Sequence, residues 1–392
     1  MEKKTKQTLI DRHLICFGDV PAFYLQTPGR IEWFGGYSTL HGGHRLTSAI
    51  NRYLYASVST HPQRTIRIIS SQFPAITLTF DEVSIQPEDH PSLKMIKTLL
   101  SLSHHQGFSF EKGINIFLHS ELPYVYHLGG STAFVATILG VLMAQQKRSH
   151  ILSKAEQSRW IQIAEQSAQR DSLYHDDSLS MLFGGTNLLP LANQDISQYQ
   201  NTMQSLKGYR LYLLNIKHQG TPPWLWMKHI VDQMNTIAHH YQQEQLLTID
   251  QLQFQFDLAD LTRMYGEKTT NKVQYFFQEM QRSKQAFLHL EKNDVHSFVQ
   301  VIKQAAMADM TLLEHHLPPQ QESKRIASTL SWLQQHLPQC TYRLQGLGFQ
   351  GPIILLFPKE DKTVFPILKK QFYLENILDL KIVKHGSRLQ TF

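Results

Sequence analysis

Glycines surround chemically useful side chains in three segments that lie far apart in the chain. In the first segment, 27–43, Arg30 directly follows Pro28-Gly29, and the pairs Gly35-Gly36 and Gly42-Gly43 come after it. Glycine weakens strands and marks turns or close backbone approach, so this segment predicts a loop rather than a plain strand. An arginine on such a loop is suited to bind a small anion. A surface turn that carries Arg30 is the alternative interpretation.

The second segment predicts an anion site at the start of a buried helix. A strand-like run at 114–118 is followed by Leu128-Gly129-Gly130-Ser131-Thr132 and then by the apolar stretch 133–143. In a strand, glycine loop and helix arrangement, free amides and the positive end of the helix dipole face the ligand. Simple capping of the helix by Ser131 and Thr132 is the alternative.

Two further features could take part in the same chemistry: a group of acidic residues and a third glycine-containing segment. Asp176 and Asp177 precede the glycine-containing stretch 181–187, and Glu165 lies upstream in a helical pattern. Taken alone, adjacent aspartates are typical of a solvated turn or a helix cap, and Glu165 is typical of an exposed helix face. The third segment, 346–351, precedes an apolar strand candidate and by itself indicates a tight turn.

Composition indicates an ordinary globular protein. The chain has 392 residues, 42% of them hydrophobic, and a formal net charge of +6, which is enough length for two domains. The basic residues are scattered, so nucleic-acid binding is not expected. The two cysteines are too few for a disulfide framework, which favours a reducing, cytoplasmic location. We find neither a signal peptide nor an apolar run that could span a bilayer, and therefore expect no membrane association.

The elements expected to position these residues are mixed along the chain, which predicts the α+β class. Strand-like runs dominate up to about residue 120, and helices follow at 132–146 and 153–168. A polar, glutamine-rich stretch from Asn193 to Leu206 suggests a boundary, with domains at 1–205 and 206–392. In the second half we expect helices at about 225–245, 258–265, 271–291, 295–316 and 322–337, and strands at 209–214, 353–357 and 379–384.

The order of these segments resembles the GHMP small-molecule kinases, and within them the galactokinases, over nearly the whole chain. The matching parts are the lead-in 16–21, the signature 28–43, the phosphate loop 123–133, a helical region 271–301, the third motif 343–351 and the tail 386–388. The resemblance implies a two-domain fold. The N-terminal domain would be of the ribosomal-protein-S5 second-domain type and the C-terminal domain ferredoxin-like, with the active site between them.

The resemblance also implies a reaction and its catalytic residues. The protein would transfer the γ-phosphate of ATP to a hydroxyl of a sugar or sugar-like small molecule, as a monomer or homodimer. Asp177 precedes Gly184 by seven residues, as the catalytic aspartate of galactokinases does, and would take or polarise the proton of the attacking hydroxyl. Arg30 would stabilise the aspartate and the transferring phosphoryl group.

Binding roles follow from the same resemblance. A magnesium ion would neutralise the phosphates and would be held by Ser131 and by Glu165, with Thr132 as the alternative hydroxyl. Glu165 stands twelve residues before Asp177, which is the family's interval. The implied nucleotide-binding residues are Leu128, Gly129, Gly130, Ser131 and Thr132. The implied substrate-binding residues are Gly36, Tyr37, Thr39, Asp177, Gly346 and Gly348.

The chain departs from the galactokinase pattern in the sugar-binding segment. Galactokinases hold galactose hydroxyls with a glutamate, a histidine and an aspartate, and this chain has Gly36, Tyr37 and Thr39 there. Each lost partner of a buried hydroxyl costs about 1–3 kcal/mol, so galactose is not the expected acceptor. The phosphate loop is altered as well, because Val125-Tyr126-His127-Leu128 stands where the family has Gly-x-Gly-Leu and so places bulky residues there. In the third motif Leu347 and Gln350 replace glycines.

Three functions are therefore open from the sequence. The first is an active kinase for a sugar other than galactose, as the joint presence of Arg30, Asp177, Glu165 and Ser131 indicates. The second is a pseudokinase that senses a ligand or binds a partner, as the bulky replacements indicate. The third is a heptose phosphate kinase, because the stretch 183–187 resembles that branch and its substrate would be a sugar phosphate.

Overall fold

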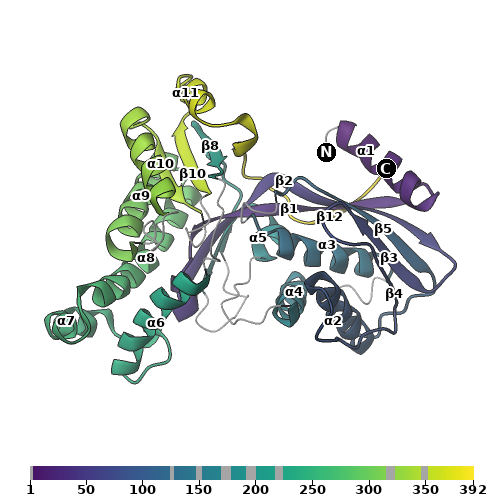
Figure 1. Cartoon of the computed structure of the whole chain (residues 1–392), viewed down its shortest axis with the longest axis horizontal. Helices are drawn as coiled ribbons and strands as arrows, with labels where there is room; N and C mark the ends of the chain where they lie inside the picture. Colours follow the sequence, from purple (N-terminus) through teal and green to yellow (C-terminus); the bar gives the residue numbers. More distant parts are fainter. Residues whose placement is uncertain are drawn as a thin grey trace.

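The computed structural model describes residues 3–123, 128–146, 152–168, 178–190, 200–216, 224–314, 323–345 and 352–392. Within these ranges the strands form two sheets (Figure 1). The first sheet has the order β12-β1-β2-β5-β3-β4, with β6 paired to β2 and β7. Its strands are β1 (Phe23–Phe34), β2 (His44–His61), β3 (Thr65–Ser70), β4 (Ile76–Thr79), β5 (Gly113–Ser120), β6 (Thr186–Pro190), β7 (Gln200–Thr202) and β12 (Arg388–Thr391).

The second sheet is antiparallel and has the order β11-β8-β10-β9. Its strands are β8 (Tyr209–Leu214), β9 (Thr341–Leu344), β10 (Ile353–Pro358) and β11 (Ile377–Leu380). Successive side chains of a strand point to opposite faces, and β8 follows this rule. Leu211 and Leu213 pack into the large hydrophobic core that lies between the first sheet, its helices and helices α8 and α9. Tyr212 and Leu214 face the other way and pack under helix α10. This sheet is therefore buried on both faces.

Helices cover both sheets (Figure 1). Helices α2 to α5 lie on one face of the first sheet, and α1 lies on the opposite face. Helices α8 and α9 pack against the second sheet and against β1 and β2. The bounds are α1 (Lys3–Phe17), α2 (Pro91–His105), α3 (Gly130–Ala144), α4 (Lys154–Ala168), α5 (Ser178–Phe183), α6 (Trp224–His240), α7 (Gln251–Tyr265), α8 (Glu267–Glu291), α9 (Val295–Ala308), α10 (Ser323–His336) and α11 (Val364–Gln371).

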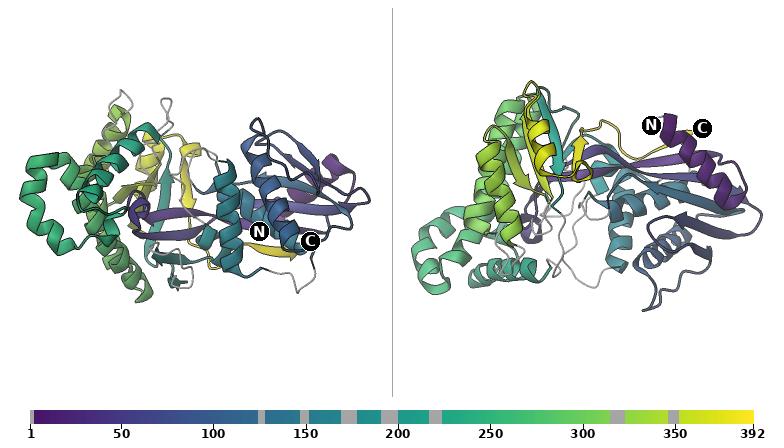
Figure 2. Two further views of the ribbon diagram at one scale, coloured as in Figure 1. Left: turned by 90° about the horizontal axis from the view of Figure 1, so that it is seen from below. Right: turned by 45° about the horizontal axis from the view of Figure 1, so that its top comes forward.

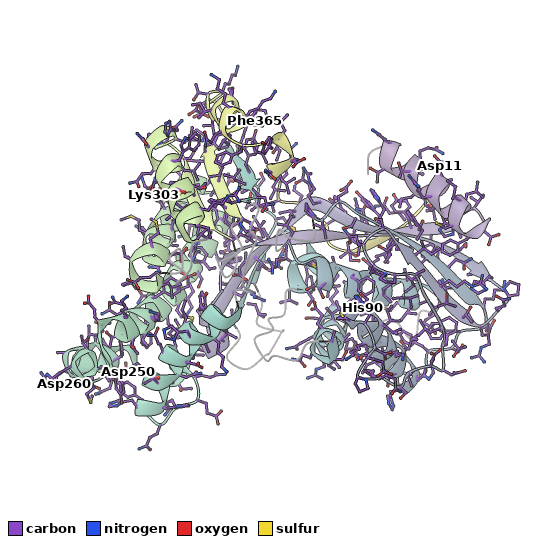
Figure 3. The ribbon with its side chains drawn as sticks, viewed as in Figure 1. Asp11, His90, Asp250, Asp260, Lys303 and Phe365 are labelled. Atoms are coloured by element: carbon purple, nitrogen blue, oxygen red, sulfur yellow. The ribbon has the colours of Figure 1, made fainter. Side chains whose placement is uncertain are left out.

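Local sequence explains where several helices begin and end. Asp250 accepts a hydrogen bond from Leu252 N at 2.8 Å and starts α7 at the far end of the molecule (Figure 3). Asp294 caps α9 in the same way, through Ser297 N at 3.0 Å. Asn293, with φ of 58°, makes the left-handed turn between α8 and α9. Beyond α9 the chain continues as one π-helical turn, Asp309–Leu313, which places Asp309 in the interior.

The structure corrects the expectation of a loop at residues 27–43. Strand β1 runs through Pro28, Gly29 and Arg30 to Phe34, paired to β2 along its length. Register shifts at Pro28/Arg30 and Glu32/Phe34 allow the proline and the glycine to remain in the strand, because a bulge leaves residues out of the ladder. Only the part after Phe34 leaves the sheet, as a short 3₁₀ helix at Ser38–His41.

The two ends of the chain meet on the first sheet. Strand β12 pairs with β1, and Lys6 Nζ lies 5.8 Å from the centre of the Phe392 ring. Figure 2 shows the termini side by side in two further views. Thus β12 crosses back over the expected boundary at residue 205, and the division into 1–205 and 206–392 stays a prediction. The helix α1 and the strands β1 and β9 have no counterpart among the expected elements.

Candidate functional site

The amino end of α3 forms a cradle of bare backbone. Gly129 has φ of 75°, and a Cβ added there would come within 2.1 Å of Met181 Cε and 3.2 Å of Arg30 Cγ. A Cβ on Gly130 would meet no atom within 4 Å, so the space above this turn is open. Leu128 is buried beneath it. The backbone amides of a first helical turn and the helix dipole make such a helix end suitable for binding phosphate.

Arg30 lies directly against that cradle. Its backbone N–H donates to Leu128 O at 2.9 Å, which ties β1 to the loop that precedes α3. The side chain is 8% exposed and passes beside Gly129. The backbone can come this close only because Gly29 and Gly129 lack side chains, since a Cβ on Gly29 would approach Leu122 Cδ2 to 2.4 Å. The guanidinium is thus at the amino end of α3.

A hydroxyl and a carboxylate meet behind the first turn of α3. Thr132 Oγ1 donates to Glu165, with 3.0 Å to Oε1 and 3.2 Å to Oε2, and both residues are buried. Glu165 is therefore not on an exposed face of α4. Ser131 points elsewhere, because it is exposed and its hydroxyl lies 3.7 Å from Met95 Sδ on α2. The structure brings Thr132, and not Ser131, to Glu165.

These two oxygen-bearing groups fit a magnesium ion. Magnesium takes oxygen ligands, usually one or two carboxylates together with substrate phosphates and water. The Thr132 hydroxyl and the Glu165 carboxylate are such ligands, and they stand beside the end of α3 where phosphates would bind. Across the described ranges no cluster of three or more His, Cys, Asp or Glu side chains could hold a metal ion.

A buried ion pair stands where β1 ends and the loop begins. Arg45 Nη2 lies 3.0 Å from Glu32 Oε2, and both side chains are at most 5% exposed. The other carboxylate oxygen of Glu32 accepts from Gly36 N at 3.0 Å. Gly35, with φ of 134°, lies so close to Arg45 that a Cβ would be 3.1 Å from its Cγ. The charged pair thus supports the backbone of the segment that carries the predicted substrate-binding residues.

Two of those predicted residues serve the local fold. Tyr37 is 1% exposed and packs into the core formed by α6, α8 and the π-helical turn. Burial raises its pKa well above the usual value, and the charge of Asp309 adds to this. Thr39 Oγ1 donates to Gly36 O at 3.1 Å within the 3₁₀ turn. Their role in binding a substrate stays a prediction.

Gln345 connects the second sheet to Arg30. It follows β9 and is 1% exposed. In one orientation of its amide, Oε1 accepts from Arg30 Nη1 and from Glu32 N, both at 3.1 Å, while the nitrogen donates to Glu32 O at 3.3 Å. A side chain from the C-terminal half therefore orients the arginine of the N-terminal half.

Arg343, two residues before Gln345, is surrounded by acids. Its Nε lies 2.7 Å from Asp309 Oδ2 and its Nη2 lies 2.8 Å from Glu279 Oε1. It also donates to Trp33 O and, at 3.2 Å, to the Tyr275 hydroxyl. Burial by itself would lower the pKa of Arg343, but the two carboxylates raise it well above the usual value. This cluster joins β9, α8 and the π-helical turn to β1.

Several predicted site residues lie outside the described ranges. These are Asp177, Gly346 and Gly348, together with Tyr126, His127, Leu347 and Gln350. The helix that follows Asp177 in the sequence is described. Helix α5 packs against β1 and α3, and Met181 of this helix reaches Gly129. The meeting of Arg30 and Asp177 stays a prediction.

Sequence reasoning missed Glu32, Arg45, Gln345 and the Arg343 cluster. One signal for Glu32 was present, since residues 30 and 32 of a strand face the same side and charges are unusual in a buried strand. No comparable signal marks Arg45 or Gln345, because their partners are set by the pairing of β1 with β2 and by the approach of β9. No helix in the described part of the chain is both long and apolar enough to cross a bilayer.

The curated proteins that resemble this chain in sequence include galactokinases. No model of a known protein family matches the chain. The galactokinase of Levilactobacillus brevis is 20% identical over 380 residues, which cover 92% of each chain. A second galactokinase, from Limosilactobacillus fermentum, is 24% identical over 144 residues, 36% of this chain and 37% of the relative.

Solved structures share the fold. The galactokinase of Lactococcus lactis, solved with galactose, superposes with a TM-score of 0.78 and 16% identity, over 99% of this chain and 100% of that one. The mevalonate kinase of Methanococcus jannaschii gives 0.63 and 14% identity, over 92% and 98%. These matches confirm the expected α+β GHMP kinase fold. The chain is thus similar to galactokinases over nearly its whole length, and it shares the fold of the GHMP kinases.

Proposed function

We propose that the chain is a kinase that transfers the γ-phosphate of ATP to a hydroxyl of a sugar or sugar-like molecule. The observation that carries the proposal is the joint placement of Arg30, the glycine cradle of α3 and the Thr132–Glu165 pair. A cation, free amides and oxygen ligands for a metal are the groups that phosphoryl transfer needs at one place. Galactokinase relatives and GHMP kinase neighbours support the same reaction class.

Each group has a separate task in this reaction. The amides at the start of α3 bind and orient the nucleotide phosphates. Arg30, held by Gln345, stabilises negative charge on the transferring group. Thr132 and Glu165 would hold a magnesium ion, which supplies charge neutralisation of the phosphates when bound. Asp177, by resemblance, takes the proton of the acceptor hydroxyl.

In the segment predicted to bind the acceptor, this chain departs from the galactokinase pattern. Galactose is bound in the Lactococcus lactis structure. In this chain Gly36 replaces one expected sugar ligand, and Tyr37 replaces another and is buried in a hydrophobic core. The carboxylate near Gly36 comes from Glu32 and is paired with Arg45. We therefore propose a sugar or sugar phosphate other than galactose as the acceptor.

The direct test is ADP formation with magnesium, ATP and a panel of sugars and sugar phosphates that includes galactose. We expect turnover with at least one member and little with galactose. Asp177→Ala should abolish turnover while ATP binding, measured by thermal shift, persists. Full activity of Asp177→Ala would refute the role of this residue. A chain that shows no thermal shift with any nucleotide and magnesium would refute the kinase function.

Binding without turnover on any acceptor would favour the pseudokinase that the sequence left open. Turnover confined to sugar phosphates would favour the heptose phosphate kinase alternative. The panel therefore separates the three functions without further variants.

A further inference from the structure

A basic cavity lies at the end of the second sheet that is remote from the candidate active site. It encloses about 500 Å³. Its lining comes from the turn before β8, the residue after β10 and the stretch at the end of β11. Its lining includes four basic residues, Lys207, Arg210, Lys359 and Lys381, and one acidic residue, Asp379, all of them exposed.

The sheet register shows that this cavity is a separate site. Tyr209 pairs with Pro358 at the cavity end, and Leu214 pairs with Ile353 at the other end. Ile353 pairs in turn with Leu344, the neighbour of Gln345, which contacts Arg30. Five residue steps along β8 amount to roughly 17 Å. None of the residues assigned above to nucleotide, metal or acceptor lines the cavity.

The cations of the cavity are not neutralised by neighbouring acids. Among the described residues, none of the four basic side chains forms an ion pair with a carboxylate. Arg210 Nη1 donates to the Tyr212 hydroxyl at 3.2 Å, so the side chain of Arg210 lies on the face of β8 opposite to Leu211. Glu360 follows Lys359 but does not line the cavity. The cavity thus carries an excess of positive charge.

The walls also have space for a ligand and a connection to the first sheet. Gly208, with φ of 81°, exposes bare backbone, because a Cβ there would meet no atom within 4 Å. Lys381 is bound to Asn51 of β2 through two hydrogen bonds, Asn51 N to Lys381 O at 3.0 Å and Lys381 N to Asn51 Oδ1 at 2.6 Å. The cavity is therefore at the junction of the two sheets, and its shape depends on how they are joined.

We propose that this cavity binds the phosphate group of a small phosphorylated molecule, independently of the kinase reaction. Lys207, Lys359 and Lys381 around one hollow favour a dianion over a monoanion, since each cation adds to the attraction. A volume of about 500 Å³ lies within the range of small-molecule sites and exceeds what inorganic phosphate alone would fill. A phosphate ester with an organic part of sugar size is the ligand class that matches both observations.

Calorimetric titration of the full chain with glucose 6-phosphate, and separately with inorganic phosphate, tests the proposal. We expect glucose 6-phosphate to bind more tightly than phosphate, with affinity that falls as sodium chloride rises. The double variant Lys359→Glu, Lys381→Glu should weaken binding at least about tenfold, because two attractions become repulsions. The matched control is Lys4→Glu, Lys303→Glu, which makes the same change of net charge at exposed positions of α1 and α9 (Figure 3). This control should bind as the unchanged chain does.

Two further variants separate this site from the candidate active site. Arg30→Gln and Thr132→Val should retain glucose 6-phosphate binding if the cavity is the site. Loss of binding in these variants and retention in the cavity variant would overturn the proposal, as would absence of binding by the unchanged chain. Equal loss in the cavity variant and in the control variant would also overturn it, since net charge alone would then explain binding.

A local readout completes the test. Lysine acetylation followed by mass spectrometry should show that glucose 6-phosphate protects Lys359 and Lys381 but not Lys303. Protection of all three to the same degree would contradict a specific site. Since neither experiment measures turnover, its outcome does not depend on whether the proposed kinase function holds.

Discussion

Two buried arginines, Arg343 and Arg45, illustrate different uses of charge in this molecule. Arg343 is bound by two carboxylates, a hydroxyl and a carbonyl that come from three distant parts of the chain. Arg45 is paired with Glu32 across the neighbouring strands β1 and β2, beside the loop of the candidate site. The first cluster holds the two halves of the molecule together. The second pair supports a short segment whose sequence departs from that of the galactokinases.

The burial of both arginines has an energetic consequence. A charge taken out of water is tolerated only when its partners compensate the lost hydration, and removal of one partner leaves the other uncompensated. The cluster of Arg343 contains two acids that would be left buried together. Arg45 is paired with Glu32, which also accepts from a backbone amide. We therefore expect stability to depend on the first and acceptor choice to depend on the second.

The largest effect is expected for Arg343→Met. This change leaves Asp309 buried without its cation and leaves Glu279 with only the ion pair to Arg282 at 3.3 Å, so it should lower the free energy of unfolding by about 3–5 kcal/mol. Urea denaturation measures it. The control is Arg263→Met, whose side chain is 79% exposed and pairs with Asp260 one turn away, and which should change stability by less than about 1 kcal/mol. A similar decrease in the free energy of unfolding in both variants would contradict the structural importance of the Arg343 cluster.

The next effect is expected for Glu32→Gln. The amide can still accept from Gly36 N but no longer neutralises Arg45, so stability should fall by about 1–3 kcal/mol. If the pair shapes the acceptor pocket, KM for the acceptor should rise more than kcat falls. The double variant Glu32→Gln, Arg45→Gln should recover part of the stability, which a double-mutant cycle detects. A coupling energy of zero between the two positions would contradict the ion pair.

A smaller effect is expected at the proposed magnesium site, where two neighbouring hydroxyls can be compared. Thr132→Val removes the hydroxyl that contacts Glu165 and should reduce activity about 10–100-fold, mainly by raising the magnesium concentration needed. Ser131→Ala should have much less influence, because its hydroxyl faces Met95. Activity as a function of magnesium distinguishes them. A larger loss of activity in Ser131→Ala than in Thr132→Val would indicate that Ser131, and not Thr132, binds the metal.

The smallest expected effect is on the pH dependence of stability, and it concerns His41 at the end of the 3₁₀ helix Ser38–His41. Burial lowers the pKa of His41 to about 4, from an unfolded value near 6.5. The unfolded chain therefore binds more protons between these values, so stability is full above pH 6.5 and is lost as pH falls toward 4. Both ring nitrogens lack a hydrogen-bond partner among the described residues. His41→Phe should therefore cost little at neutral pH and make the loss in acid less steep.

His13 provides the contrast for that measurement. Its pKa is also lowered to about 4 by burial, but its ring nitrogens lie 3.0 Å from Ser57 Oγ and 2.9 Å from Ser59 Oγ. His13→Phe should therefore destabilise the chain at neutral pH as well, since it leaves two buried hydroxyls without this partner. Stability curves of the two variants that coincide at every pH would contradict the assignment.

Much of the fold followed from patterns of residues. The apolar run after Ser131 became α3, and most helices between 225 and 337 lie close to where periodicity put them. The expectation failed at β1, because proline and glycine ordinarily interrupt strands and here are accommodated by bulges. It also placed Glu165 on an exposed helix face when the residue was taken alone, whereas α4 turns it inward to Thr132.

By itself, the sequence determined the element types, the glycine positions that permit close backbone approach, and the resemblance to galactokinases. These follow from local conformational preference and from residues that stay in order along the chain. Only the tertiary structure decided that Thr132 reaches Glu165, that Glu32 binds Arg45, and that Gln345 orients Arg30. Such contacts depend on strand register and on the approach of segments far apart in the chain. A shift of one residue in register would turn each side chain to the opposite face.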